Sequence, residues 1–254
     1  MIRTIHDHPN INRFLGVTKN DIGYVMVLDY ANEGDLRHYL GNKVKFDSLQ
    51  WEDKIQMALD ITRGLKYLHS KEIIHRDLHS KNILVNNGKL LLADFGLSKQ
   101  LTEITSNSTA NKRGIFEYID PQCYKNTSYK KDKKSDVYSL GILLWEITSG
   151  RPPFRDLDRN NLYYLIGNAC NREDPIEGTP LKYQQLYQEC WDDDPKKRPN
   201  INKVYETLSQ LNTNYTNDQH EDYLETSHRD ELEKLNAQSN QSDLYIETVL
   251  IDDD

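Results

Sequence analysis

The sequence has few cysteines, no long apolar run and no secretory leader pattern. Its three cysteines, Cys123, Cys170 and Cys190, stand far apart, without metal-ligand or disulfide spacing. No apolar run approaches the roughly 18 residues of a membrane span. The N-terminus lacks the basic-then-apolar layout of a secretory signal. We therefore expect an intracellular, cytoplasmic chain without a membrane span, in which Cys190 packs in the core.

Acidic residues outnumber basic ones. The formal net charge is −8, and the stretch from Thr213 to the end holds twelve acidic residues against two basic ones. The rest of the chain is nearly balanced and offers no concentrated basic face, which argues against nucleic-acid binding. Polar residues dominate after Thr213, so we expect residues 213–254 to be an acidic, largely disordered tail with a short helix near 220–235. Such a tail could dock a partner.

What the sequence does contain is a series of segments whose patterns predict strands or helices. Apolar alternation predicts strands at 12–18 and 24–28, joined by a turn at 20–23, and a hairpin of 83–85 with 89–92. Helical spacing of Ala58, Ile61, Leu65 and Leu68 predicts a helix over about 51–69. Further helices are expected at 135–148, 160–170, 181–191 and 201–211.

Two short motifs flank the 83–92 hairpin. The run from His75 to Asn82 reads H-R-D-L-x-x-x-N, and Asp94-Phe95-Gly96 follows the second strand. Metal-assisted phosphoryl transfer needs a carboxylate that accepts a hydroxyl proton and oxygen ligands that hold Mg²⁺ against ATP. Asp77 suits the first role, and Asn82 and Asp94 suit the second. The pair of motifs resembles the catalytic and metal-binding loops of eukaryotic protein kinases.

The resemblance extends from about residue 8 to 211 and is closest to the tyrosine-kinase-like group, whose members usually phosphorylate serine or threonine. It implies an α+β, kinase-like fold: a mainly helical C-lobe with a remnant of the N-lobe sheet. The implied divisions are 1–30 for the N-lobe remnant and hinge, 31–212 for the C-lobe and 213–254 for the tail. The implied function is ATP- and Mg²⁺-dependent transfer of the γ-phosphate to a hydroxyl of a protein substrate.

The same resemblance implies an adenosine site. Leu28, Asp29 and Ala31 match the hinge, where Leu28 flanks the adenine pocket and the Asp29 carbonyl and Ala31 N–H meet the base. Asp35 falls where kinases place an acid for the ribose hydroxyls, and Leu84 matches the apolar floor under adenine. Without the downstream motifs, plain strand-end packing would be the favoured explanation of the hinge residues.

Structural roles are implied for three further positions. Asp136 is expected to hydrogen-bond the catalytic-loop backbone, and His75 is expected to support the Asp94 loop by packing and hydrogen bonding. Arg76 matches the arginine that pairs with a phosphorylated residue in the activation segment. The candidates for that phosphate are Thr102, Thr105, Ser106, Ser108 and Thr109.

The chain departs from the kinase pattern at several places. His79 replaces a lysine that contacts the transferred phosphate, and Lys81 stands where many tyrosine kinases place an arginine serving the same oxygen. Ile115 replaces a hydroxyl residue that touches the catalytic loop. Gln122 replaces the glutamate of A-P-E, so it can offer Arg198 only a neutral hydrogen bond, weaker than the usual ion pair.

The front of the pattern differs most. The printed sequence holds no G-x-G-x-x-G loop, and the lysine and glutamate that clamp the ATP phosphates are missing. Three hypotheses follow: an N-terminally truncated protein kinase domain, a catalytically impaired pseudokinase that serves as a binding scaffold, or an unstable fragment with unpaired strand edges.

Overall fold

In a computed structural model of the chain, the structure describes residues 8–100, 114–126, 128–155, 157, 162–168 and 170–215. The contacts divide the chain into units of residues 1–212 and 213–254. The five candidate phosphoacceptors, the expected helix at 220–235 and nearly all of the acidic tail lie outside the described residues. The three-part division into lobe remnant, C-lobe and tail stays a prediction.

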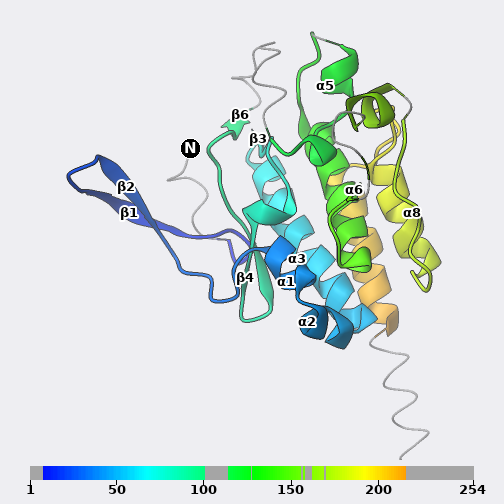
Figure 1. Cartoon of the computed structure of the whole chain (residues 1–254), viewed down its shortest axis with the longest axis horizontal. Coiled ribbons are helices and arrows are strands. Elements are labelled where there is room, and N and C mark those ends of the chain that lie inside the picture. Colours follow the sequence, from blue (N-terminus) through cyan, green and yellow to red (C-terminus); the bar gives the residue numbers. More distant parts are fainter. Residues whose placement is uncertain are drawn as a thin grey trace, which may run out of the picture. The chain divides into compact units, whose positions relative to one another are not determined.

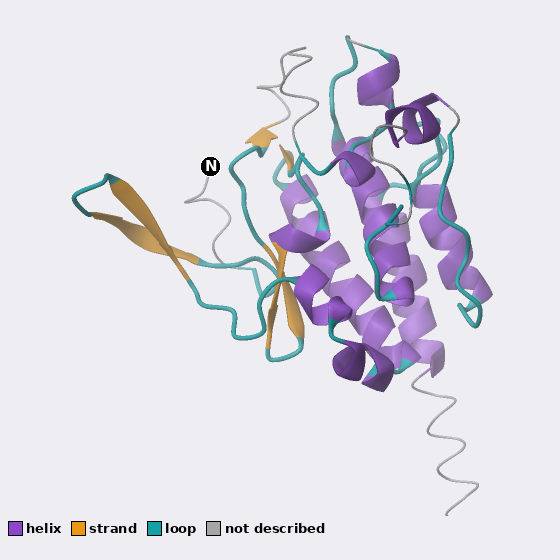
Figure 2. Ribbon diagram, viewed as in Figure 1, coloured by secondary structure: helices purple, strands orange, loops and turns teal. Residues whose placement is uncertain are grey.

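Three two-stranded antiparallel sheets are present in the described part of the chain. β1 (Phe14–Lys19) pairs with β2 (Tyr24–Leu28), β4 (Ile83–Asn86) with β5 (Lys89–Leu92), and the short β3 (Ile73–Ile74) with β6 (Lys99–Gln100). Figure 2 shows these strands in orange beside the purple helices. The two expected hairpins are confirmed, with the first strand shifted by one or two residues.

The β1–β2 hairpin is held by its turn and is otherwise poorly covered. Asn20 and Gly23 exchange two backbone hydrogen bonds of 2.9 and 3.2 Å, and Gly23 has a φ of 152°, which favours glycine. Apolar side chains along both strands remain exposed: Val17 to 58%, Tyr24 to 81% and Met26 to 57%. The hairpin therefore contributes little to the core.

Helices form most of the remaining regular structure, and loops join them. The α-helices are α1 (Leu36–Gly41), α2 (Lys43–Ser48), α3 (Trp51–Ser70), α5 (Gln122–Lys125), α6 (Lys133–Ser149) and α8 (Leu181–Cys190), and residues 201–215 are helical. Short 3₁₀ turns cover Ser80–Asn82 and Phe116–Tyr118. Residues Tyr163–Asn168 form a π-helix, where a longer α-helix over 160–170 was expected. Over the described residues 163–168, that prediction was wrong in helix type.

The core is centred on α6, which packs against α3 and α8 (Figure 1). Nearly every residue of α6 from Ser135 to Thr148 is buried, as its apolar sequence predicts. Gly141 permits the close approach of α8, because a Cβ there would lie 2.8 Å from the Cβ of Cys190. Gly150 then ends the helix in the left-handed region, with a φ of 67°.

Candidate active site

A buried carboxylate on α6 fixes the backbone of the H-R-D motif. Asp136 accepts hydrogen bonds from the backbone N–H groups of His75 and Arg76, both at 2.9 Å, and lies 2.9 Å from the Nε2 of His69. Burial alone would raise its pKa, but the hydrogen bond and charge of His69 outweigh burial and lower it. Asp136 therefore acts as an ionised anchor, which confirms its expected structural role.

His75 links this motif to the second one. Its buried ring places Nε2 3.1 Å from the carbonyl oxygen of Ala93, and the ring centroid lies 5.3 Å from that of Phe95. Burial lowers the pKa of His75, against the opposing charges of Asp136 and Asp77. A neutral imidazole that donates to Ala93 fits these surroundings. The expectation that His75 supports the Asp94 loop is confirmed.

Asp77 and Asn82 are in direct contact. The Nδ2 of Asn82 donates to the backbone carbonyl of Asp77 at 2.9 Å and to its Oδ2 at 3.2 Å. The other carboxylate oxygen, Oδ1, is buried and has no hydrogen-bond partner among the described residues. Gly114 lies against it, since a Cβ at Gly114 would come within 2.6 Å of Oδ1. The Oδ1 of Asp77 is thus covered by Gly114, and its Oδ2 accepts a hydrogen bond from the amide of Asn82.

A backbone hydrogen bond between the neighbouring residue Ala93 and Asn82 brings Asp94 close to this pair. The N–H of Ala93 donates to the carbonyl of Asn82 at 2.9 Å, and Asp94 follows with a φ of 54°. Its carboxylate is exposed and accepts a 3.1 Å hydrogen bond from the N–H of Gly96. The structure therefore brings Asp77, Asn82 and Asp94 into one region.

The donor set near Asp94 fits Mg²⁺. Magnesium prefers oxygen ligands and is usually held by one or two protein groups together with phosphates and waters. The Nδ2 of Asn82 donates to Asp77, so the atom that Asn82 would offer a metal is its Oδ1, and Asp94 has an exposed carboxylate. Within the described ranges, no group of three or more His, Cys, Asp or Glu residues could hold a metal alone.

The residues expected to contact adenosine lie in two places. Leu28 is 44% exposed at the end of β2, and the N–H of Asp29 donates to the carbonyl of Arg13, with an ion pair between the two side chains at 2.8 Å. Asp35 caps α1 by accepting from the N–H of His38 and forms an isolated β-bridge with Leu84. The structure brings Asp35 and Leu84 together.

Ala31 lies in the segment that joins Asp29 to Asp35, and it is partly buried. The link that contains it is held to the β4–β5 hairpin. The N–H of Glu33 donates to the carbonyl of Val85 at 3.1 Å, and the N–H of Val85 donates to the carbonyl of Gly34 at 2.8 Å. This link therefore runs beside the strand that carries Leu84.

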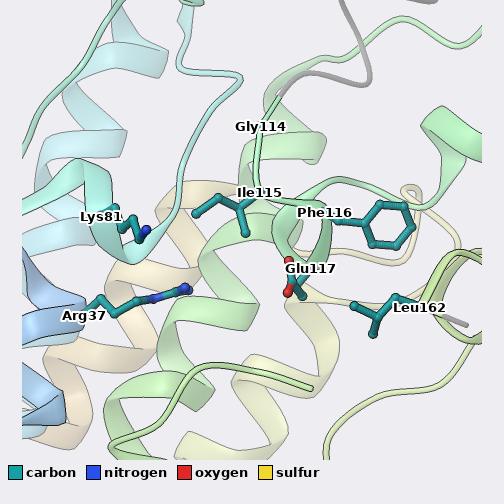
Figure 3. Close-up of a pocket in the computed structure, with 7 residues that line it drawn as sticks. All are labelled: Arg37, Lys81, Gly114, Ile115, Phe116, Glu117 and Leu162. Carbon is teal, nitrogen blue, oxygen red and sulfur yellow. The ribbon is translucent and has the colours of Figure 1, made fainter. Parts of the chain in front are cut away.

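A cavity of about 420 Å³ opens beside Asp77. It is lined by Arg37, Lys81, Gly114, Ile115, Phe116, Glu117 and Leu162. Figure 3 shows Arg37 and Lys81 pointing into it from one side, towards Ile115 and Glu117 on the other. The volume falls in the range of sites that accept a side chain or small ligand. Lys81, an expected catalytic residue of the H-R-D motif, is exposed and lines this cavity.

A buried polar network supports the wall of this cavity. Arg37 donates to the hydroxyls of Tyr118 at 2.8 Å and Ser80 at 3.0 Å, and Tyr118 donates to Glu146. Burial raises the pKa of Glu146 to about 7, despite opposing contributions from Tyr118 and Arg37. Sequence reasoning missed this network. Its one sign in the sequence is Glu146, a single glutamate within the very apolar helix α6.

The expected contact between Gln122 and Arg198 is not formed. Asp120 occupies that role: its carboxylate takes hydrogen bonds of 2.7 and 3.0 Å from the guanidinium of Arg198, and both side chains are fully buried. Gln122 instead donates to the carbonyl of Asp193 at 2.9 Å. The correction has a simple cause: in D-P-Q, unlike A-P-E, the acid stands two residues earlier and still reaches the guanidinium.

Comparison with known proteins decides the family. Residues 1–208 match the family described as protein tyrosine and serine/threonine kinase. The chain belongs to this protein kinase family. The expected kinase-like α+β fold, with a helical C-lobe and a small sheet remnant, is confirmed with it.

Several kinases are similar along most of this chain. The serine/threonine/tyrosine-protein kinase HT1 of Arabidopsis thaliana is 34% identical over 202 residues, which cover 79% of this chain and 50% of HT1. A probable LIM domain-containing serine/threonine-protein kinase of Dictyostelium discoideum is 33% identical over 83% of the chain and 32% of that protein. The tyrosine-protein kinase abl-1 of Caenorhabditis elegans is 30% identical, over 94% and 19%. The chain therefore spans half or less of these relatives' lengths.

Among the described residues of this kinase chain, no helix is long and apolar enough to cross a membrane.

Proposed function

We propose that this kinase chain binds Mg²⁺-ATP and transfers the γ-phosphate to a hydroxyl group of a protein, serine or threonine in preference to tyrosine. The observation that carries the proposal is the contact of Asp77 with Asn82, together with the backbone hydrogen bond that joins Asn82 to the strand leading into Asp94. A proton acceptor and two oxygen ligands are thereby held in one region, as phosphoryl transfer requires.

In this reaction the acceptor oxygen forms a bond to the γ-phosphorus as the bond to the β-phosphate oxygen breaks, and ADP leaves. Asp77 takes the proton of the acceptor hydroxyl. Asn82 and Asp94 would hold Mg²⁺, which would neutralise charge on the phosphates. Lys81, which is exposed beside the cavity, supplies a positive charge near the transferred phosphate.

We assign the adenosine to the hinge and the acceptor peptide to the cavity. Leu28, Asp29 and Ala31 would meet the base, Asp35 the ribose and Leu84 the lower face of the adenine. The cavity lined by Arg37, Lys81 and Ile115 adjoins Asp77 through Gly114, so a side chain next to the acceptor hydroxyl would enter it. An intracellular, cytoplasmic location and a partner for the acidic tail belong to the same proposal.

The test compares three forms of the full chain by substrate labelling and by thermal shift with Mg²⁺-ATP. Asp77→Asn should lower labelling about 10²–10⁴-fold, because it removes the proton acceptor, while the thermal shift persists. Asp94→Asn should reduce the part of that shift that depends on magnesium. Asp47→Asn, at an exposed site on α2, is the matched control and should leave both readouts unchanged.

Two outcomes would contradict the proposal. Labelling that survives Asp77→Asn would exclude this residue as the proton acceptor. A chain that neither labels a substrate nor gains stability from Mg²⁺-ATP would support the alternative, a scaffold without catalysis.

A further inference from the structure

Two residues that depart from the kinase pattern, His79 and Ile115, determine the surroundings of one atom, the Oδ1 of Asp77. The Oδ1 of Asp77 is buried without a hydrogen-bond partner among the described residues. Ile115, which follows Gly114 in the cavity wall, has no hydroxyl to offer. The imidazole of His79 faces this oxygen, with its Nε2 3.5 Å from Oδ1. This distance is at the outer limit of a hydrogen bond, and such contacts often tighten only when substrate is bound.

The ring of His79 is held in place from several sides. The residue is 7% exposed, its ring meets the edge of Tyr118 with centroids 6.0 Å apart, and its carbonyl accepts a 2.8 Å hydrogen bond from the N–H of Asn82. The charged or titratable groups around it are Asp77, His75 and Arg37. The imidazole therefore has little freedom to turn away from Asp77.

The second ring nitrogen indicates which tautomer is present. The Nδ1 of His79 is buried and has no hydrogen-bond partner in the described part of the chain. A proton on Nδ1 would leave a buried donor unsatisfied, and the Oδ1 of Asp77 would face a bare nitrogen. A proton on Nε2 instead lets the ring donate towards Asp77 and leaves only an acceptor unpaired.

We propose that His79 is a positioning residue for Asp77: its neutral imidazole donates the Nε2 proton to Oδ1 and fixes the carboxylate between His79 and Asn82. Because Oδ1 is buried, the acceptor proton then goes to Oδ2. This inference rests on the proposed role of Asp77 as proton acceptor. His79 thereby supplies a hydrogen-bond donor to Asp77 that the apolar side chain of Ile115 cannot supply.

The kinetic test uses variants that separate the hydrogen bond from the ring's volume. His79→Phe keeps a ring against Tyr118 but loses the donor, and it should lower kcat about tenfold or more, while KM for ATP and the melting temperature stay near their wild-type values. His79→Gln retains an N–H donor at similar reach and should restore most of kcat. His38→Phe, an exposed histidine on α1, controls for the substitution itself.

A second measurement does not need turnover. Long-range ¹H–¹⁵N NMR of the histidines should show His79 as the neutral tautomer with its proton on Nε2, and Asp77→Ala should shift that proton's resonance. A proton on Nδ1 would overturn the proposal, and so would wild-type kcat in His79→Phe. Should Asp77→Asn abolish labelling while His79→Phe has no effect, the proposed function stands and only this inference fails.

Discussion

Replacing Asp120 with alanine should destabilise the protein strongly, because it leaves a guanidinium buried without its partner. The side chains of Asp120 and Arg198 are both 0% exposed and share two hydrogen bonds, and the carboxylate also accepts from the hydroxyls of Tyr129 at 2.8 Å and Ser135 at 3.0 Å. Breaking a buried pair from one side costs about 3–5 kcal/mol. Typical domains have only about 5–15 kcal/mol in total.

The assay is urea unfolding of the full chain followed by circular dichroism. Asp120→Ala should lower the unfolding free energy by about 4 kcal/mol and the melting temperature by about 10 °C. The control is Glu72→Gln, which breaks the exposed ion pair of Glu72 with Lys133 and should cost less than about 1 kcal/mol. Equal losses in the two variants would refute the reasoning.

A second substitution tests whether Arg198 is the residue that pairs with the carboxylate of Asp120. Gln122→Glu in the wild-type protein loses the bond to Asp193 and should destabilise it. In the Asp120→Ala background, the new carboxylate can reach Arg198 and should recover part of the loss. The same effect of Gln122→Glu in both backgrounds would mean that Arg198 is not the shared partner.

Two further predictions concern α6. The pKa of Glu146 is raised from 4.5 to about 7 by burial, so the folded state binds an extra proton between these values. The resulting contribution to the free energy of unfolding is present at low pH, and about 3 kcal/mol of it is lost as the pH rises through this window. Glu146→Gln should therefore weaken the dependence of the urea midpoint on pH between pH 5 and 8. An unchanged pH dependence would contradict the raised pKa of Glu146. Gly141→Ala should cost about 2 kcal/mol, because its Cβ would lie 2.8 Å from that of Cys190, whereas Gly41→Ala, with nothing within 4 Å, should cost nothing; similar melting temperatures would contradict this contrast.

The features predicted correctly from the sequence depend on residues close together along the chain. The hairpin turn at 20–23, the periodic burial of α3 and the apolar run of α6 each follow from local spacing. The grouping of Asp77, Asn82 and Asp94 also belongs here, because a short hairpin separates the two motifs. Their roles in catalysis stay a prediction that the labelling experiment tests.

The features that were missed depend on contacts between distant residues or on short elements. Asp120 and Arg198 are 78 residues apart, and nothing local shows that the acid of D-P-Q reaches the guanidinium. Glu146 joins a network with residues from three other segments. The helices α1 and α2 have six residues each, too few for a helical period, and the caps at Asp35 and Asn42 were their only local signal.

Because Asp136 of α6 accepts hydrogen bonds from the backbone N–H groups of His75 and Arg76, we expect the catalytic loop to unfold together with α6. These two amide protons can exchange with solvent only when α6 itself opens, so they should be among the slowest to exchange. Warming would then abolish catalysis and tertiary structure in a single step.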